Sequence, residues 1–275
     1  MALFDLTRIF GYPYLKDNGA SLGVPIVKEL STIDSKPARN TVAECYTEII
    51  SDLKNSTELL SGDFNKGKVN RWAAMTLLSR VYLYKGEYNE ALTMAENAIK
   101  GAEKEGYALW TNEEYPTAWG NDASASNPGE ILFEIVNLTT DSPGKESMGY
   151  LNSYNGYDDM CITCSFYQLL KKDPKDVRLK ILSFDKKYYA YVNKYQPQQG
   201  ENITDANIPL IRLSEAYLNA AEAAVQTGDN AKAVKYLNSI VQRANPENSV
   251  EGKTLTLENV LDERRKELVA EGHRM

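Results

Sequence analysis

Two helical hairpins with alanine-rich faces constrain this chain more than any other feature. In residues 208–244, small and apolar side chains recur at the spacing of one helix face. Gly228 interrupts this pattern, which resumes after it. Gly228 suits a left-handed helix cap, and Asp229 or Asn230 can cap the helix that follows. Pro209 suits a first helical turn, where its missing N–H costs nothing. The stretch predicts a tetratricopeptide-type hairpin whose two backbones approach closely.

A second copy of this pattern lies upstream, in residues 69–103. Gly86 separates its two helical segments, and Ala91 follows Gly86 by five residues. Ala233 stands at the same distance from the glycine of the first hairpin. This spacing matches the tetratricopeptide repeat. The two copies are not in tandem, so a long insertion separates them.

The insertion, residues 104–207, differs in kind from the hairpins. It contains 15 of the 27 aromatic residues, helical periodicity is mostly lost, and Gly, Asn, Asp, Ser and Pro are frequent. This composition predicts loops. Strands are expected at 130–136 and 188–192, with a short helix at 165–171. A loop-rich insertion of this length in a helical scaffold usually carries function.

The expected fold is therefore mainly α, with tetratricopeptide-like hairpins and a partly β insertion. We expect one domain over residues 1–275, with its helical frame in 1–103 and 208–275. Residues 40–60 predict a further helix. Its buried side is expected to consist of Val42, Cys45, Tyr46, Ile49, Ile50 and Leu53.

The last predicted helix, capped by Thr256, carries a charged segment. Glu263 and Glu267 are four residues apart and would repel each other on an isolated helix. Basic partners are expected, either Arg264 nearby or Arg212 at the hairpin. We therefore predict a structural cluster that ties this helix to the hairpin, and the alternative is a solvated charged face.

Composition excludes several classes of function. The net charge is −7 and the isoelectric point is about 5.0, which argues against a nucleic-acid partner. No apolar run is long enough to span a membrane. His273 is the single histidine, which argues against a Ser-His-Asp catalytic triad and against a histidine-rich metal site. Cys161 and Cys164 are either a redox pair, half a metal site or two ordinary thiols. No cofactor is expected.

Several blocks of the sequence resemble the SusD/RagB family, and their order along the chain agrees with that family. The blocks are Leu3–Tyr14, Gly67–Arg80, Asn127–Glu134, Ile208–Ala223, Leu237–Ala244 and Asp262–Arg274. The resemblance implies an outer-membrane, cell-surface lipoprotein of Bacteroidetes that captures nutrients, usually glycans. It also implies a partner, a SusC-like TonB-dependent barrel transporter that receives the ligand.

Family members also carry a signal peptide, a lipidated cysteine and further residues before the position of Ala2, and they continue past Met275. The resemblance therefore implies a fragment that lacks the N-terminal part and the extreme C-terminus. Membrane contact would then occur only through a lipid anchor that is absent from these 275 residues.

Candidate ligand-binding residues cluster in residues 149–159. Tyr150, Tyr154 and Tyr157 alternate with polar residues that include Asn155 and Asp158. Aromatic rings match the apolar C–H face of a sugar, and amide and carboxylate groups match its hydroxyls. The resemblance places this segment at one side of the family's glycan pocket. The alternative is that the tyrosines pack the insertion against the helices.

Trp110 and Trp119 flank a polar loop and are further candidates, either as an exposed sugar platform or as buried core. Glu113–Glu114 and Asp158–Asp159 are paired carboxylates. A glycosidase needs two carboxyl groups across a cleft, which adjacency in sequence does not supply. Asp158–Asp159 can instead contribute to a calcium site. We therefore expect no catalytic residues.

Three functions remain in competition. The first is a surface glycan-binding subunit that hands its ligand to a TonB-dependent transporter. The second is a tetratricopeptide-type protein-interaction scaffold without sugar binding. The third is a carboxylate glycosidase on a helical frame. The sequence favours the first and does not identify the sugar.

Overall fold

The structure is a computed structural model of the chain. It describes residues 1–30, 32, 34–65, 67–120, 128–185, 189–197 and 202–273. Three residues used in the sequence analysis lie outside these ranges. They are Asn127 and Arg274, in two of the family-like blocks, and Tyr188, at the start of an expected strand.

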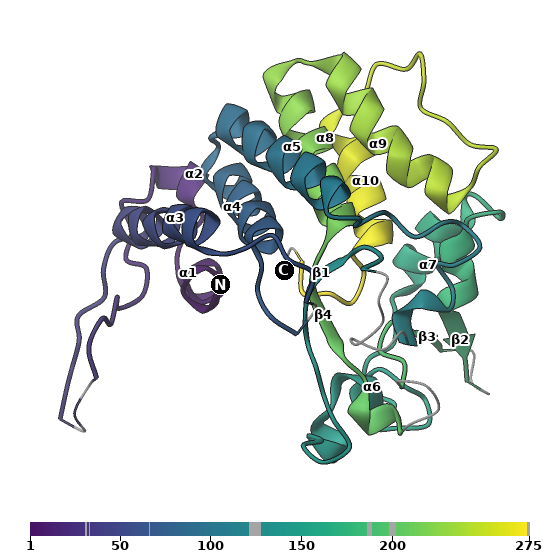
Figure 1. Cartoon of the computed structure of the whole chain (residues 1–275), viewed down its shortest axis with the longest axis horizontal. Helices are drawn as coiled ribbons and strands as arrows, with labels where there is room; N and C mark the ends of the chain where they lie inside the picture. Colours follow the sequence, from purple (N-terminus) through teal and green to yellow (C-terminus); the bar gives the residue numbers. More distant parts are fainter. Residues whose placement is uncertain are drawn as a thin grey trace.

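The frame is helical, and the prediction of a mainly α fold with tetratricopeptide-like hairpins is confirmed (Figure 1). Before the insertion it consists of α1 (Ala2–Phe10), α2 (Tyr14–Asp17), α3 (Val42–Leu59), α4 (Arg71–Lys85) and α5 (Tyr88–Lys104). After the insertion it consists of α8 (Leu213–Thr227), α9 (Asn230–Ala244) and α10 (Leu257–Glu267). All six side chains expected on the buried side of α3 are buried.

Local sequence fixes both hairpin turns as predicted. Gly86 and Gly228 have φ angles of 84° and 81°, in the left-handed region where a side chain is disfavoured. The Asp229 side chain then caps α9 by accepting a hydrogen bond from the Lys232 N–H at 3.0 Å. Thr256 caps α10 in the same way through the Asn259 N–H.

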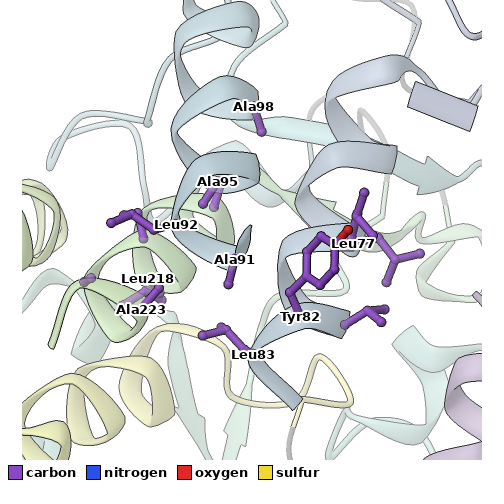
Figure 2. Packing of buried hydrophobic residues seen from close by; sticks show 14 of the residues in the cluster. Leu77, Tyr82, Leu83, Ala91, Leu92, Ala95, Ala98, Leu218 and Ala223 are labelled. Carbon is purple, nitrogen blue, oxygen red and sulfur yellow. The ribbon is translucent and has the colours of Figure 1, made fainter. Parts of the chain in front are cut away.

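The two hairpins pack directly on each other although a long segment separates them in sequence. The contact between α5 and α8 is as extensive as the contact between α4 and α5 within one hairpin. Figure 2 shows Ala91 and Ala95 of α5 between side chains of α4 and side chains of α8, such as Leu218. Because alanine adds only a methyl group, three neighbouring helices share one close-packed core.

One boundary of the frame differs from the prediction. Residues Ile208–Arg212 form strand β4, which pairs antiparallel with β1 (Ile131–Ile135), and α8 begins only at Leu213. Pro209 therefore lies opposite Glu134 in a two-stranded sheet and not in a first helical turn. Proline is tolerated there because every strand of such a sheet is an edge strand. The pairing partner is distant in sequence, so local spacing did not reveal it.

The insertion is irregular, as predicted, and its few regular elements are short. They are β1, α6 (Met148–Leu151), α7 (Cys164–Lys171), β2 (Leu182–Phe184) and β3 (Ala190–Val192). Strands β2 and β3 form a small antiparallel sheet. The expected strand at 130–136, the expected helix at 165–171 and the described part of the strand at 188–192 are all present, whereas β2 was not predicted.

A buried cluster of charged side chains joins the insertion, the second hairpin and the C-terminal segment. At its centre the Glu267 carboxylate is completely buried and lies 3.1 Å from Arg212, 2.7 Å from Arg243 and 3.3 Å from Arg178. Arg212 also pairs with Glu130, the residue immediately before β1 in the sequence, and with Glu271 at 2.8 Å. Charges removed from water are tolerated only when they are paired and hydrogen-bonded in this way.

Three of the four charged residues predicted to tie α10 to the hairpin lie in this cluster, and the fourth, Arg264, lies against α8. Arg212 is beside Glu267, but Glu263 pairs with Arg178 of the insertion at 2.6 Å. Arg264 turns away toward α8, where its Nε donates to Glu222 at 3.1 Å. The charged segment of α10 therefore holds the insertion as well as the hairpin.

We predict that Glu267→Gln lowers the free energy of unfolding by about 3–5 kcal/mol, because it leaves buried arginines without their shared anion. The urea unfolding midpoint, followed by circular dichroism, measures this effect. Glu258→Gln is the matched control, because Glu258 is exposed in the first turn of the same helix and should cost less than about 1 kcal/mol. Equal losses for the two variants would show that the cluster does not stabilise the fold.

The same cluster predicts acid sensitivity. Burial opposes ionisation of Glu267, but Arg243, Arg212 and Arg178 outweigh it and hold its pKa well below the ordinary 4.5. The pKa of Glu271 is lowered similarly against its burial, chiefly by Arg212.

Because both pKa values are depressed in the folded state, the stabilisation is complete above the unfolded value and is lost as the pH falls toward the folded values. The unfolding midpoint should therefore fall steeply below about pH 4.5. The Glu267→Gln variant should show a shallower fall over the same range. A midpoint independent of pH between 3 and 5 would contradict this assignment.

Candidate functional site

A loop at residues 147–160, which we call the tyrosine loop, carries the sequence-predicted ligand-binding residues of the insertion. Ser147 begins it by capping α6, where its Oγ accepts a hydrogen bond from the Tyr150 N–H at 3.1 Å. The chain then turns back on itself, and the Tyr157 N–H donates to the Tyr150 carbonyl at 3.2 Å. Gly156 permits this closure, since a Cβ there would lie 1.9 Å from the Tyr150 oxygen.

The tyrosine loop presents rings and polar groups together at the surface. Tyr154 and Tyr157 each keep 45 % of their surface exposed, and Asn155 and Asp158 are also exposed. Tyr150 is half-buried and meets Tyr157 edge to face, with ring centroids 5.1 Å apart. The loop therefore exposes two rings, an amide and a carboxylate within five residues of sequence.

The small β2–β3 sheet packs against the tyrosine loop through Tyr191. Tyr191 of β3 is buried, and its hydroxyl donates a hydrogen bond to the Asp158 carboxylate. The Tyr154 ring lies 6.2 Å from the Tyr191 ring. Asp158 has a φ of 63°, in the left-handed region that aspartate tolerates better than most residues. The exposed loop thus rests on a fixed side chain of the core.

The two tryptophans are not an exposed platform, which corrects that expectation. Trp110 and Trp119 are buried and meet each other at 71° with ring centroids 5.0 Å apart. The Trp119 ring also faces the charged groups of Arg212 and Lys194, each 4.8 Å from its centroid. These rings cover the buried charged cluster, where cation–π contacts stabilise desolvated cations. They cannot offer a face to a sugar in this structure.

A cavity of about 670 Å³ opens beside the tyrosine loop, between α6, α7 and α10. The loop itself contributes Met148, Asn152 and Met160 to the cavity wall. Leu261 of α10 also lines it and is half-buried. Sequence reasoning missed the cavity because its two walls come from segments that are far apart in the chain.

Titratable groups around the cavity do not form a catalytic or metal centre. Burial lowers the pKa of His273 well below its ordinary value, and the nearby Arg80 and Arg264 add to this effect. Among the described residues that line the cavity, Asp262 is the one carboxylate. Across the part of the chain that the structure describes, no three His, Cys, Asp or Glu side chains gather as a metal site requires. No third side chain of these four types therefore joins Asp158 and Asp159 in that part of the chain.

The two neighbouring cysteines are free thiols in this structure. Cys161 is exposed and lines the cavity, while Cys164 is exposed at the start of α7. Thr163 between them has an extended backbone because it caps the helix.

Family models match most of the chain. A model described as "SusD family" matches residues 100–275, which include the tyrosine loop and the cavity. A second model, described as "Starch-binding associating with outer membrane", matches residues 1–83. The chain belongs to the SusD family. The resemblance of the family-like sequence blocks is thereby confirmed.

Solved structures agree with the SusD assignment. A SusD superfamily protein from Bacteroides vulgatus is 41 % identical, with a TM-score of 0.90 over 99 % of this chain and 62 % of its own. The surface glycan-binding protein A from Bacteroides uniformis shares the fold, with 21 % identity and a TM-score of 0.70 over 91 % of this chain and 60 % of its own.

A SusD-like protein from Bacteroides ovatus is 24 % identical over 97 % of this chain. The chain spans 54 % of the length of that relative. Within the described residues, no helix combines the length and the apolar character needed to cross a bilayer.

We predict that Gly156→Ala disrupts the tyrosine loop without unfolding the frame, because the new Cβ collides with the Tyr150 backbone. Ring signals of Tyr150 and Tyr157 in NMR spectra should shift as their contact is lost, while signals from α4 and α5 stay in place. Glu146→Ala is the control, since Glu146 is exposed immediately before the loop and its truncation adds no atom. Unchanged tyrosine signals in the Gly156 variant would contradict the loop geometry.

Proposed function

We propose that this SusD-family protein is a cell-surface glycan-binding subunit that delivers its ligand to a TonB-dependent outer-membrane transporter. The observation that carries the proposal is the tyrosine loop, on which Tyr154, Asn155, Tyr157 and Asp158, neighbours in sequence, are all exposed. The description of the model that matches residues 1–83 and the name of the Bacteroides uniformis neighbour support glycan as the ligand class.

The chemistry of the loop fits a sugar better than it fits most other ligands. A pyranose has apolar C–H faces, which pack on aromatic rings, and a rim of hydroxyl groups. Asn155 offers both donors and an acceptor, whereas ionised Asp158 offers acceptors to those hydroxyls. The Tyr154 ring packs on Tyr191 and the Tyr157 ring packs on Tyr150, so little side-chain freedom is lost on binding.

The arrangement supports binding without catalysis. A glycosidase places two carboxyl groups on opposite sides of the scissile bond. Here Asp158 and Asp159 are neighbours on one loop, and the cavity beside them contributes Asp262 as its one carboxylate among the described residues. We therefore propose that the protein holds and transfers its ligand unchanged, and that a lipid anchor and the charged faces of the helical hairpins provide its contacts with the membrane and the transporter.

A second candidate function is a tetratricopeptide-type scaffold that binds a protein or peptide. One observation favours it: a cavity of about 530 Å³ on the helical frame is lined by tyrosines that include Tyr12, Tyr14, Tyr84 and Tyr88. Aromatic-lined grooves are a common way to hold extended peptides. This function would leave polysaccharide binding absent.

The test is the affinity of the protein for soluble polysaccharides, starch included, measured by affinity electrophoresis and calorimetry. We predict that replacing Tyr154 and Tyr157 together by alanine weakens binding at least about tenfold, because two ring faces are lost. Tyr12→Ala is the matched control, because Tyr12 is 52 % exposed but lies on the helical frame.

The two candidate functions give opposite outcomes. A glycan-binding subunit is retarded by at least one polysaccharide and loses this retardation in the double variant alone. A scaffold shows no retardation with any polysaccharide. Retardation that is weakened by Tyr12→Ala and not by the double variant would place the sugar on the frame and contradict the proposed site.

A further inference from the structure

The cavity beside the tyrosine loop has walls that a bare sugar does not need. Nine of the 17 residues that line the cavity are apolar, and one more is Cys161. Sulfur-containing side chains, Met148, Met160 and Cys161, line it together with Phe166 of α7. Six polar or charged residues line it too, but sugar hydroxyls placed against the apolar part of the wall would lose hydrogen bonds to water without replacement, which costs free energy.

These walls favour an aromatic group. Thioether sulfur makes favourable contacts with ring edges, and methionine adapts its shape to the group that it surrounds. Phe166 adds a ring for edge-to-face packing. The Arg265 guanidinium lies 6.0 Å from the Phe166 ring and is held by a hydrogen bond to Ser165 Oγ at 3.2 Å. A cation near the mouth of an aromatic site attracts a further π system.

The size and position of the cavity connect it to the tyrosine loop. A cavity of about 150 Å³ in another protein already accepts benzene, and this one measures about 670 Å³. Met148, Asn152 and Met160 belong to both the loop and the cavity wall, and the exposed Tyr154 and Tyr157 lie between them in sequence. A ligand with a sugar on the loop can therefore place a group attached to that sugar in the cavity.

We propose that the ligand is a glycan with an aromatic substituent, such as an aryl ester or an aryl glycoside, and that the cavity binds the aromatic group. The inference rests on the proposed glycan-binding function and names a ligand class for the same site. The sugar contacts the tyrosine loop, whereas Phe166, Met160 and Leu261 surround the ring. Specificity then depends on the substituent as well as on the sugar.

The experiment compares matched pairs of small ligands by calorimetry. Each pair is the methyl and the 4-nitrophenyl glycoside of one sugar, taken over glucose, galactose, mannose and xylose, with free 4-nitrophenol as a further probe. For the sugar that binds, the nitrophenyl compound should bind about tenfold more tightly than the methyl compound, because the ring leaves water.

Two variants fill the cavity from residues that lie outside the tyrosine loop, Leu261 of α10 and Ile162 before α7. Leu261→Trp and Ile162→Trp should each remove the advantage of the nitrophenyl compound and leave the affinity for the methyl compound unchanged. Leu59→Trp is the matched control, because Leu59 is 85 % exposed at the end of α3, away from the cavity. Thermal unfolding of each variant shows whether it is folded.

The outcomes separate this inference from the proposed function. Equal affinities for the two members of each pair, or an advantage that survives both filling variants, would overturn the aromatic-substituent inference while polysaccharide binding stands. Binding of free 4-nitrophenol without binding of any glycoside or polysaccharide would overturn the glycan function itself.

Discussion

The structure depends on a carboxylate that has no access to water and is shared by three arginines. Glu267 can remain ionised in the interior only because Arg178, Arg212 and Arg243 surround it. These arginines come from the insertion, from the strand before α8 and from the end of α9. These three segments must therefore meet α10 at one point. If any of them moved away, an unpaired charge would remain buried.

This requirement decides where the aromatic residues of the insertion go. Trp119 covers Arg212 and Lys194, and the Tyr115 ring lies 4.3 Å from Arg243. These rings serve the charged cluster and are buried with it. Four rings in the described part of the insertion stay well exposed: Tyr154 and Tyr157 on the tyrosine loop, and Phe184 and Tyr189 at the β2–β3 sheet. The position of the buried charges therefore explains why Tyr115 and Trp119 are buried.

Much of the frame could be predicted from the sequence because its determinants are local. Gly86 and Gly228 mark their turns through backbone conformation alone, and the apolar period of α3 identifies its buried face. Strand β4 could not be predicted, because its identity depends on β1, a partner far upstream. Pro209 is compatible with both a helix start and an edge strand, and only the pairing with β1 decides between them.

The site was predictable to the extent that it lies in one segment. The tyrosine loop was found because its aromatic and amide residues are neighbours in sequence. The cavity was not, since Met160 and Leu261 meet only in the folded chain. The sequence left open whether Trp110 and Trp119 are exposed or buried, because the polar residues around them give no sign of the buried Arg212 that Trp119 covers.

We propose that the helical frame and its charged cluster hold out the tyrosine loop as the surface that captures the ligand. Hydrogen–deuterium exchange, with and without a polysaccharide that the protein retains, shows which surface the ligand covers. Added protection is expected in residues 147–160 and in the α10 wall of the cavity. Protection confined to α4, α5, α8 and α9, with the tyrosine loop unchanged, would show that the ligand binds elsewhere.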